Sequence, residues 1–349
     1  MIDEWRLEPE LWNAVRREID DRGKKGQFIL TGSASLPRDD ARHTGSGRIA
    51  QIAMRPMTLF EQGWSSRALS LGALLAGNQV LESEHSELAL LEYVNRIVIG
   101  GWPALLDATV DEARHFLESY ISTLVDQDIS EVSEAKRDPR KVQRFLLAYA
   151  QLSAHPVPLS TVIARAADTE GEDPSFGRLA AAAYADALRR MWIIDDVEAW
   201  NVSLRSKARL GKTEKRHLVD PSLAASLMGC GPKRLLADLN TLGFLFESLA
   251  TRDVRVYATA IRASIYHYRE HEGQLEIDLI VERVEEGNWI GIEVKLGSNQ
   301  IDEAAASLLK VNETRLGMPA SALLVVTATE YAYRRPDGVY VVPLGTLGP

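Results

Sequence analysis

Three residues near the end of the sequence have the types and spacing of a divalent-cation site. Glu293 and Lys295 lie two residues apart in the apolar run 290–296, so a β-strand would place both side chains on one face. Asp278 lies within the preceding apolar run, 275–284, and a turn at Gly287 would make the two strands antiparallel neighbours. We therefore expect Asp278 and Glu293 to approach closely enough to share a cation.

Such a group of side chains suits Mg²⁺ chemistry. Two carboxylates supply hard oxygen ligands, and waters fill the remaining positions around the ion. The bound metal would lower the pKa of one water and offset charge on a phosphate, while Lys295 orients that water or stabilises the developing charge. Glu247, in the amphipathic segment 242–251, would supply a further oxygen ligand. The alternative is a half-exposed strand with alternating charges and no site.

Repulsion between the two carboxylates leads to an expectation about stability. Without a cation, Asp278 and Glu293 would repel each other, so one of their pKa values should rise. On this argument the substitution Asp278→Asn should leave the metal-free protein at least as stable as the parent. The substitution Lys295→Met should lower that stability, because it removes a neutralising charge.

The elements around these residues follow the order αβββαββ. Helices are predicted at 242–251 and 301–312, and strands at 265–269, 275–284, 289–296, 322–327 and 339–342. This order resembles the PD-(D/E)XK nuclease superfamily, whose domains are restriction-endonuclease-like. The resemblance assigns Asp278 to the first acidic position, Glu293 and Lys295 to the E-x-K, and Glu247 to the upstream helical glutamate. It implies Mg²⁺-dependent cleavage of DNA, although many relatives of such folds have lost catalysis. The proline position of the motif holds Ile277.

The middle of the chain is predicted to be largely helical. Residues 66–135 carry apolar residues at helical spacing over 69–75, 88–99 and 113–129, with a break at Gly100-Gly101-Trp102-Pro103. Further helices are expected at 140–152, 159–167 and 175–191, followed by wing strands at 192–194 and 199–202. This second group resembles a winged helix-turn-helix, with a longer loop than usual at 168–174.

A basic run follows the proposed wing. It places six cations within twelve residues of an otherwise acidic chain: Arg205, Lys207, Arg209, Lys212, Lys215 and Arg216. The run is a candidate nucleic-acid-binding segment, because each contact with a phosphate would contribute affinity and salt dependence. The alternative is a solvated surface loop.

The sequence begins Met1-Ile2-Asp3-Glu4-Trp5, and the run Phe28-Ile29-Leu30-Thr31-Gly32-Ser33 follows. These two stretches resemble part of a prokaryotic AAA-type ATPase, of the group that ends in a restriction-endonuclease-like domain of unknown function. A helix is predicted at 10–22, a buried strand at 28–31 and another strand at 49–54. The resemblance matches Asp3 and Glu4 to the Walker B pair. It matches Thr31 and Ser33 to the polar sensor position and Arg48 to an arginine finger.

The Walker A loop of that family does not occur in this sequence. Gly211-Lys212-Thr213 fails the pattern, because Ser206 stands where the first glycine is needed. We therefore expect a truncated or wrongly started ATPase segment, half a domain with an exposed edge, in which ATP binds only in a full-length form with Walker A. Mg²⁺ remains the cofactor expected at the C-terminal site.

Taken together, the sequence predicts an α/β multi-domain protein. The expected parts are a partial P-loop ATPase-type segment at 1–65, a helical lid at 66–135, a winged-helix-like domain at 136–235 and a PD-(D/E)XK nuclease-like sheet domain at 236–349. The 349 residues carry a net charge of −9 and one cysteine, and no apolar run reaches 18 residues. We expect a cytoplasmic protein with DNA as its partner and without a membrane segment; the sequence does not indicate an oligomeric state.

Three functions agree with these patterns. The first is a truncated AAA-type ATPase-family protein with a nuclease-like end, associated with nucleic acid. The second is an autonomous Mg²⁺-dependent DNA nuclease. The third is a non-enzymatic interaction module that keeps the folds and has lost both chemistries, and a metal titration separates it from the second.

The missing Walker A loop leads to a prediction about nucleotide binding. Without a glycine-rich nest and its lysine to hold the phosphates, the chain should not bind Mg-ATP tightly. Isothermal titration calorimetry measures this directly, and micromolar affinity would contradict the prediction.

Overall fold

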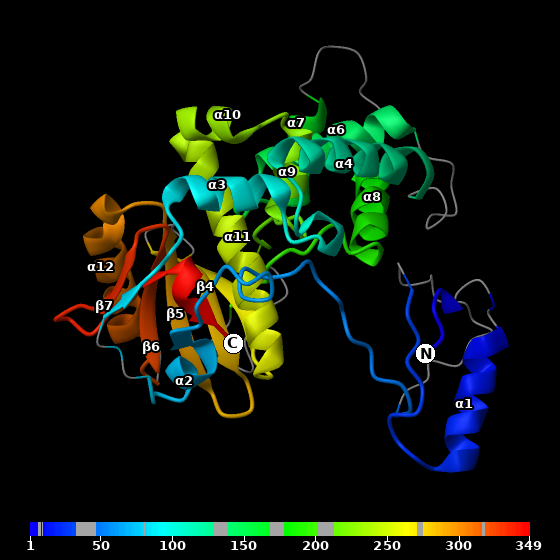
Figure 1. The fold of residues 1–349 in the computed structure, drawn as a ribbon, viewed down its shortest axis with the longest axis horizontal. Helices are drawn as coiled ribbons and strands as arrows, with labels where there is room; N and C mark the ends of the chain where they lie inside the picture. Colours follow the sequence, from blue (N-terminus) through cyan, green and yellow to red (C-terminus); the bar gives the residue numbers. More distant parts are fainter. Residues whose placement is uncertain are drawn as a thin grey trace.

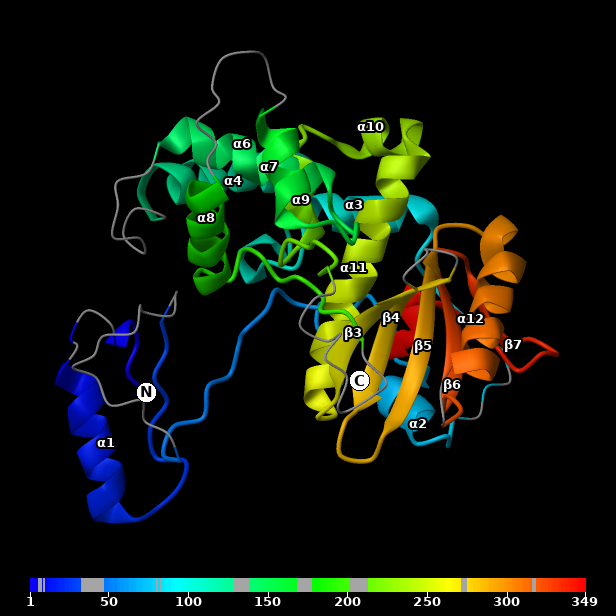
Figure 2. The same cartoon turned by 180° about the vertical axis from the view of Figure 1, so that it is seen from behind.

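The computed structural model describes residues 1–5, 8, 10–32, 47–79, 81, 83–128, 138–167, 178–200, 213–270, 275–315 and 318–349. They form a small N-terminal lobe, a helical region and a sheet region (Figure 1). The lobe stands apart from the other two regions, and residues 49–58 connect it to them without helix or strand (Figures 1 and 2). The Ser33 and Arg205–Lys212 predictions lie outside the described residues.

The sheet region contains a mixed sheet of seven strands in the order β2-β7-β8-β6-β5-β4-β3. Strands β3, β4 and β5 are antiparallel neighbours, and β5, β6 and β8 are parallel. A separate parallel pair joins β1 to β9. The bounds are β1 Leu69–Ser70, β2 Glu84–His85, β3 Ser264–Arg269, β4 Glu276–Arg283, β5 Asn288–Lys295, β6 Ala322–Thr327, β7 Tyr331–Arg334, β8 Tyr340–Pro343 and β9 Leu347–Gly348.

Two long helices cover opposite faces of this sheet. Helix α11 (Leu239–Ala260) packs against β3, β4 and β5, and α12 (Ile301–Arg315) packs against β5 and β6. Strand alternation separates the two cores, since Ile290 and Ile292 pack in the α11 cluster whereas Trp289 packs in the α12 cluster. In a regular strand of this sheet, a polar side chain therefore faces either α11 or α12, and only a break in the alternation, such as a β-bulge, changes its direction.

Helix α11 also packs against the helical region, which Figure 2 shows above the sheet. Its neighbours in the helical region include α3 and α9. Helix α11 is therefore buried on several sides, and not only on the face that packs against the sheet. The other helices are α1 Glu10–Arg22, α2 Leu71–Leu75, α3 Leu90–Ile99, α4 Val110–Thr123, α6 Pro139–Gln151, α7 Leu159–Ala167, α8 Arg178–Arg190, α9 Pro221–Leu227 and α10 Pro232–Ala237. Among the described residues, no helix has both the length and the apolar character needed to span a bilayer.

Short helical turns join several of these elements. They are η2 Pro103–Leu105, η3 Leu124–Asp128, η5 Ser298–Gln300 and η6 Leu344–Thr346. The predicted break after α3 is confirmed, because Gly100 ends the helix with a φ of 81°. A Cβ at Gly100 would lie 2.4 Å from the hydroxyl oxygen of Ser222, so both the backbone conformation and the close packing require glycine.

Several predicted elements are confirmed. The helices predicted at 10–22 and 159–167 and the strand predicted at 322–327 have those bounds in the structure. The order αβββαββ is also confirmed for the residues from 239 on, with β7 and β9 as two additional strands that the sequence pattern did not indicate. The coarse prediction of a mixed α/β protein therefore holds.

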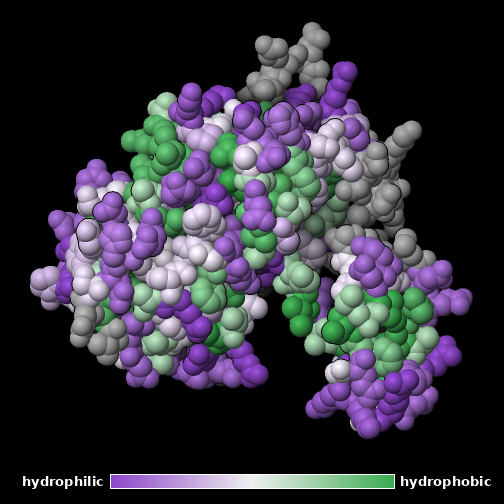
Figure 3. All heavy atoms as spheres, in the orientation of Figure 1, coloured by the Kyte–Doolittle hydropathy of each residue, from purple (hydrophilic) through white to green (hydrophobic). Residues whose placement is uncertain are grey.

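The predictions for the N-terminal lobe hold less well. Ile2 and Leu30 form one parallel β-bridge, and α1 lies between them in the chain. The buried strand predicted at 28–31 is reduced to a single bridge at Leu30, and Ile29 is exposed and not buried. The predicted strand at 49–54 is also wrong, since Ile52 and Met54 are exposed in the connecting segment. Figure 3 shows a patch of hydrophobic residues in the middle of the visible face of this lobe, bordered by hydrophilic residues.

Two predictions in the middle of the chain also need correction. Leu69 and Ser70 form a strand, so the range 69–75 is helical only from Leu71. The wing strands pair differently, because Ile194 pairs with Leu218 and Val197 pairs with Lys215. Ala199 instead bridges His267 of β3, and residues 215–218 provide the partner for 194–197. This pairing places Lys215 in a buried segment and not in a surface run.

A buried ion pair connects the helical region to α11. The Oδ2 atom of Asp220 accepts from Arg252 Nη1 at 2.8 Å and from the Gly101 backbone N–H at 3.0 Å. Its Oδ1 atom accepts from the Ser222 backbone N–H at 2.9 Å and so caps α9. Arg252 also contacts Asp253 at 2.7 Å. One carboxylate therefore satisfies groups from three separate segments.

Removing that carboxylate should destabilise the protein strongly. The substitution Asp220→Ala leaves a buried guanidinium with less compensation and two backbone N–H groups without an acceptor, a loss of roughly 3–5 kcal/mol. The matched control is Asp111→Ala, whose side chain is 85% exposed and should change the free energy of unfolding by less than about 0.5 kcal/mol. Urea denaturation compares the two, and equal losses would contradict the assignment.

Candidate carboxylate and lysine site

Strands β4 and β5 bring the predicted residues together. Leu279 lies opposite Ile292 in the antiparallel register, as the turn at Gly287 predicted, so the neighbouring Asp278 and Glu293 lie at the same level of the sheet. On β5, Ile292 and Val294 pack in the core shared with α11, so strand alternation turns Glu293 and Lys295 toward the other face.

A β-bulge changes the direction of Asp278. Tyr266 pairs with Ile280 and Tyr268 pairs with Ile277, so two residues of β4 lie opposite His267 of β3. The alternation is interrupted there, because Ile277 and Ile280 both pack in the α12 core although they are three residues apart. A bulge of this kind re-aims a side chain, and it gives Asp278 contacts on the side of α11.

The carboxylate of Asp278 is held from β5. Its Oδ2 atom accepts from the Val294 backbone N–H at 2.9 Å and lies 3.4 Å from Lys295 Nζ. The same ammonium donates to Glu293 Oε2 at 2.5 Å. The lysine therefore bridges the two carboxylates that the sequence predicted would share a cation. Lys295 is the most accessible of these side chains, at 25% exposed, whereas Asp278 and Glu293 are buried.

A second lysine completes the site from the other side. Lys215 Nζ donates to Glu247 Oε1 at 2.7 Å and to Asp278 Oδ1 at 3.1 Å, and it lies 3.7 Å from Glu276 Oε1. Sequence analysis placed Lys215 in the basic run, where nothing distinguishes it from its neighbours. One available signal was the charge balance, because three buried carboxylates and one lysine are too acidic to bury without another cation.

The pKa values of the site follow from burial and these contacts. Burial raises the pKa of Glu247 to about 7, with the charge of Asp278 acting in the same direction and Lys215 opposing it. Burial and the charge of Asp278 also raise the pKa of Glu293 well above its usual range. Burial opposes ionisation of Asp278 too, but Lys215, Lys295 and the Val294 N–H outweigh it and lower the pKa of that carboxyl.

Burial removes the last two residues of the basic run from the surface. Burial alone would lower the pKa of Lys215, but the charges of Glu247 and Asp278 outweigh it and keep the lysine protonated. Arg216 Nη1 contacts Asp196 at 2.8 Å and Glu214 at 2.7 Å. Both cations are buried and paired within the protein, so neither lies on the surface of this structure, and their contact with nucleic acid stays a prediction.

The predicted nucleotide-site residues lie in the N-terminal lobe. The hydroxyl group of Thr31 donates to Asp3, which brings together two residues that the resemblance predicted to act in one site. Glu4 adopts a left-handed conformation, with a φ of 43°. Arg48 instead pairs with Asp20, near the end of α1, at 2.5 Å. This pairing directs the predicted arginine finger to the helix surface.

The chemistry of the buried side chains fits one Mg²⁺ ion. Among the described residues, no three carboxylate, histidine or cysteine side chains are grouped around one cation position. Asp278 and Glu293 nonetheless provide two carboxylates that share one ammonium partner, and Mg²⁺ is commonly held by one or two carboxylates while it keeps several waters. These two residues are the ones that would hold the ion.

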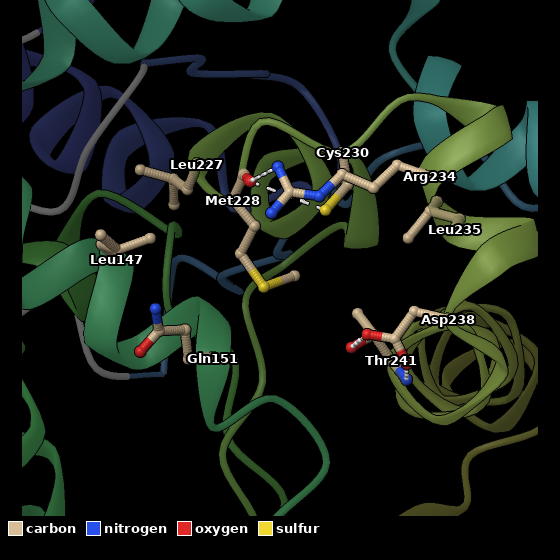
Figure 4. Close-up of a pocket in the computed structure, with 9 residues that line it drawn as sticks. All are labelled: Leu147, Gln151, Leu227, Met228, Cys230, Arg234, Leu235, Asp238 and Thr241. Carbon is tan, nitrogen blue, oxygen red and sulfur yellow. Dashed lines mark hydrogen bonds between the residues drawn. The ribbon is translucent and has the colours of Figure 1, made fainter.

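Two cavities lie in the helical region, away from these carboxylates. One has a volume of about 310 Å³ between α6, the end of α9, α10 and the start of α11. Figure 4 shows Arg234 pointing toward the Met228 carbonyl group in this cavity, with Cys230 beside it. The other cavity, of about 670 Å³, lies between α4, η3, α6 and α9. The carboxylate of Asp238, which lines the first cavity, caps the start of α11 and so has a role in the local fold.

Comparison with known proteins finds two families. Residues 90–234 match a domain of unknown function (DUF8612), and residues 242–347 match a second domain of unknown function (DUF4143). Neither a curated protein nor a solved structure matches the chain. The first match contains Lys215, whereas Glu247, Asp278, Glu293 and Lys295 all lie in the second. The site is therefore assembled from both matched regions.

These contacts reverse the expected effect of Asp278→Asn. The expectation of a neutral or stabilising effect assumed unpaired carboxylates, but Asp278 is ionised and paired with two lysines. Removing its charge should cost roughly 3–5 kcal/mol without metal, as for other broken buried ion pairs. The control is Asp302→Asn, at a side chain that is 91% exposed. Urea denaturation in EDTA measures both, and equal stability of Asp278→Asn and the parent would contradict this account.

Proposed function

We propose that the sheet region is a restriction-endonuclease-like domain of the PD-(D/E)XK type, and that the chain acts on nucleic acid with Mg²⁺ as its cofactor. The observation that carries this proposal is the convergence of Asp278, Glu293 and Lys295 from two neighbouring strands, with Glu247 on the preceding helix. Isolated alternating charges on a half-exposed strand would not bury these carboxylates or direct them to shared partners.

The side chains then have separate roles. A bound Mg²⁺ ion would supply an activated water and offset charge on the phosphate. Asp278 and Glu293 would hold the ion, and the Val294 N–H keeps the Asp278 carboxylate in a fixed orientation. Lys295, the most accessible of the group, would meet the phosphate oxygen first and stabilise its charge.

The N-terminal lobe supports the broader resemblance to an AAA-type ATPase segment. A parallel bridge between Ile2 and Leu30, connected through α1, is the pairing of a β-α-β unit. The hydrogen bond from Thr31 to Asp3 joins the proposed Walker B and sensor positions. We propose that this lobe is a partial ATPase segment, and that nucleotide binding requires a Walker A loop in a full-length form.

A non-enzymatic interaction module is the second candidate. It is favoured by the pairing of Glu247, Asp278 and Glu293 with lysines, and by the burial of all three carboxylates. Such a site is electrically balanced enough to persist without a metal, as an inactive relative of a nuclease would require.

Metal-dependent stability separates the two candidates. If Asp278 and Glu293 hold Mg²⁺, millimolar Mg²⁺ or Mn²⁺ should raise the melting temperature of the parent through binding to the folded state. Asp278→Asn and Glu293→Gln should each lose this increase, whereas Asp302→Asn should keep it. The measurement is differential scanning fluorimetry with EDTA as the reference.

Cleavage of DNA provides the matching activity measurement. Supercoiled plasmid incubated with the parent and Mn²⁺ should be nicked, and the rate should fall at least about 100-fold in Lys295→Met, as when a charge-stabilising group is removed from other active sites. A parent chain whose melting temperature does not respond to Mn²⁺ and that leaves the plasmid intact would favour the interaction module.

A further inference from the structure

Lys215 crosses from one matched region into the site of the other. Its backbone is fixed in the helical region, because its N–H donates to Val197 at 2.9 Å and its carbonyl group accepts from Val197 at the same distance. A second bridge joins Lys215 to Pro156. The side chain then reaches the carboxylates of α11 and β4. The backbone pairing therefore fixes the position of the Lys215 ammonium group.

The ammonium group occupies the space between two carboxylates. Glu247 and Asp278 each provide one oxygen within 3.1 Å of Lys215 Nζ, and the side chain is only 1% exposed. Glu276 lies slightly farther away, at 3.7 Å. The sequence predicted a cation shared by Asp278 and Glu293, with Glu247 as a further ligand. In the structure a lysine ammonium, and not a metal ion, lies between Glu247 and Asp278.

We propose that Lys215 is the built-in cation of this site, taking the position between Glu247 and Asp278 that a divalent metal ion would otherwise occupy. Glu247 is then a ligand of the lysine and not of the metal. Any Mg²⁺ ion is then confined to the opposite side of Asp278, next to Glu293; this location of the metal rests on the proposed function.

The charge balance supports this division of the site. Glu247, Asp278 and Glu293 carry three formal negative charges, and Lys215 and Lys295 carry two positive charges, which leaves one negative charge. Without Lys215, the same carboxylates would leave two negative charges and an open position between Glu247 and Asp278.

The decisive variant is Lys215→Met in the full chain, because methionine fills most of the same volume without the charge. In EDTA its melting temperature should fall by at least about 5 °C, because buried carboxylates are left without their partner. Millimolar Mn²⁺ or Mg²⁺ should restore at least about half of the loss by binding between Glu247 and Asp278. Adding Glu247→Gln to this variant should abolish the restoration.

A control and a second variant complete the experiment. Lys233→Met, at an exposed position of α10, should change neither the melting temperature nor its response to metal. Glu247→Gln in the presence of Lys215 should leave the metal response of the parent unchanged, because Glu247 binds lysine. This second measurement does not depend on Lys215→Met being folded.

The metal responses of the parent and of Lys215→Met test the role of Lys215 separately from the metal site at Asp278 and Glu293. A metal response in Lys215→Met but not in the parent supports the built-in cation and contradicts the Asp278–Glu293 metal site. Three results would overturn the built-in cation: Lys215→Met melting like the parent, Lys215→Met remaining unfolded or unrestored in Mn²⁺, or Glu247→Gln alone abolishing the metal response of the parent.

Discussion

The burial of the Asp278 carboxylate is the constraint on which the rest of the site depends. A buried carboxylate must be paired, and Asp278 obtains its partners from three places: the backbone of β5, Lys295 on the same strand, and Lys215 from the helical region. Each partner requires a different part of the fold to be in place. The full set of partners around Asp278 therefore forms only when the sheet, α11 and the helical region are all folded and packed together.

The sequence predicted this site only in part, and the reason is the range of the interactions involved. Asp278, Glu293 and Lys295 lie on strands joined by one short turn, so local alternation was sufficient to bring them together. Lys215 depends on the pairing of residues 215–218 with 194–197, and on the bulge that turns Asp278 toward α11. Neither feature leaves a periodic pattern in the sequence. Charge balance could therefore indicate that a second cation was needed, but only the tertiary contacts identify it as Lys215.

The fold shows the same division between local and long-range information. The helices at 10–22 and 159–167 were predicted because their apolar spacing and end residues are contained within the segment. Strands β1 and β2 were missed because each has only two residues, and each exists through a partner far along the chain. The exposed Ile29 was assigned to a buried strand because an apolar run does not show whether anything covers it.

The pairing of β1 with β9 has a consequence for how the protein forms during synthesis. Leu69 pairs with Leu347, and the hydroxyl group of Ser65 donates to the Leu347 carbonyl group. In the sequence, the whole helical region lies between the two partners of this contact. A ribosome adds roughly 5–20 residues per second, so the earlier strand waits on the order of tens of seconds for its partner. During that interval the helical region can fold, and its paired segment can hold Lys215 ready before the carboxylates of the sheet emerge.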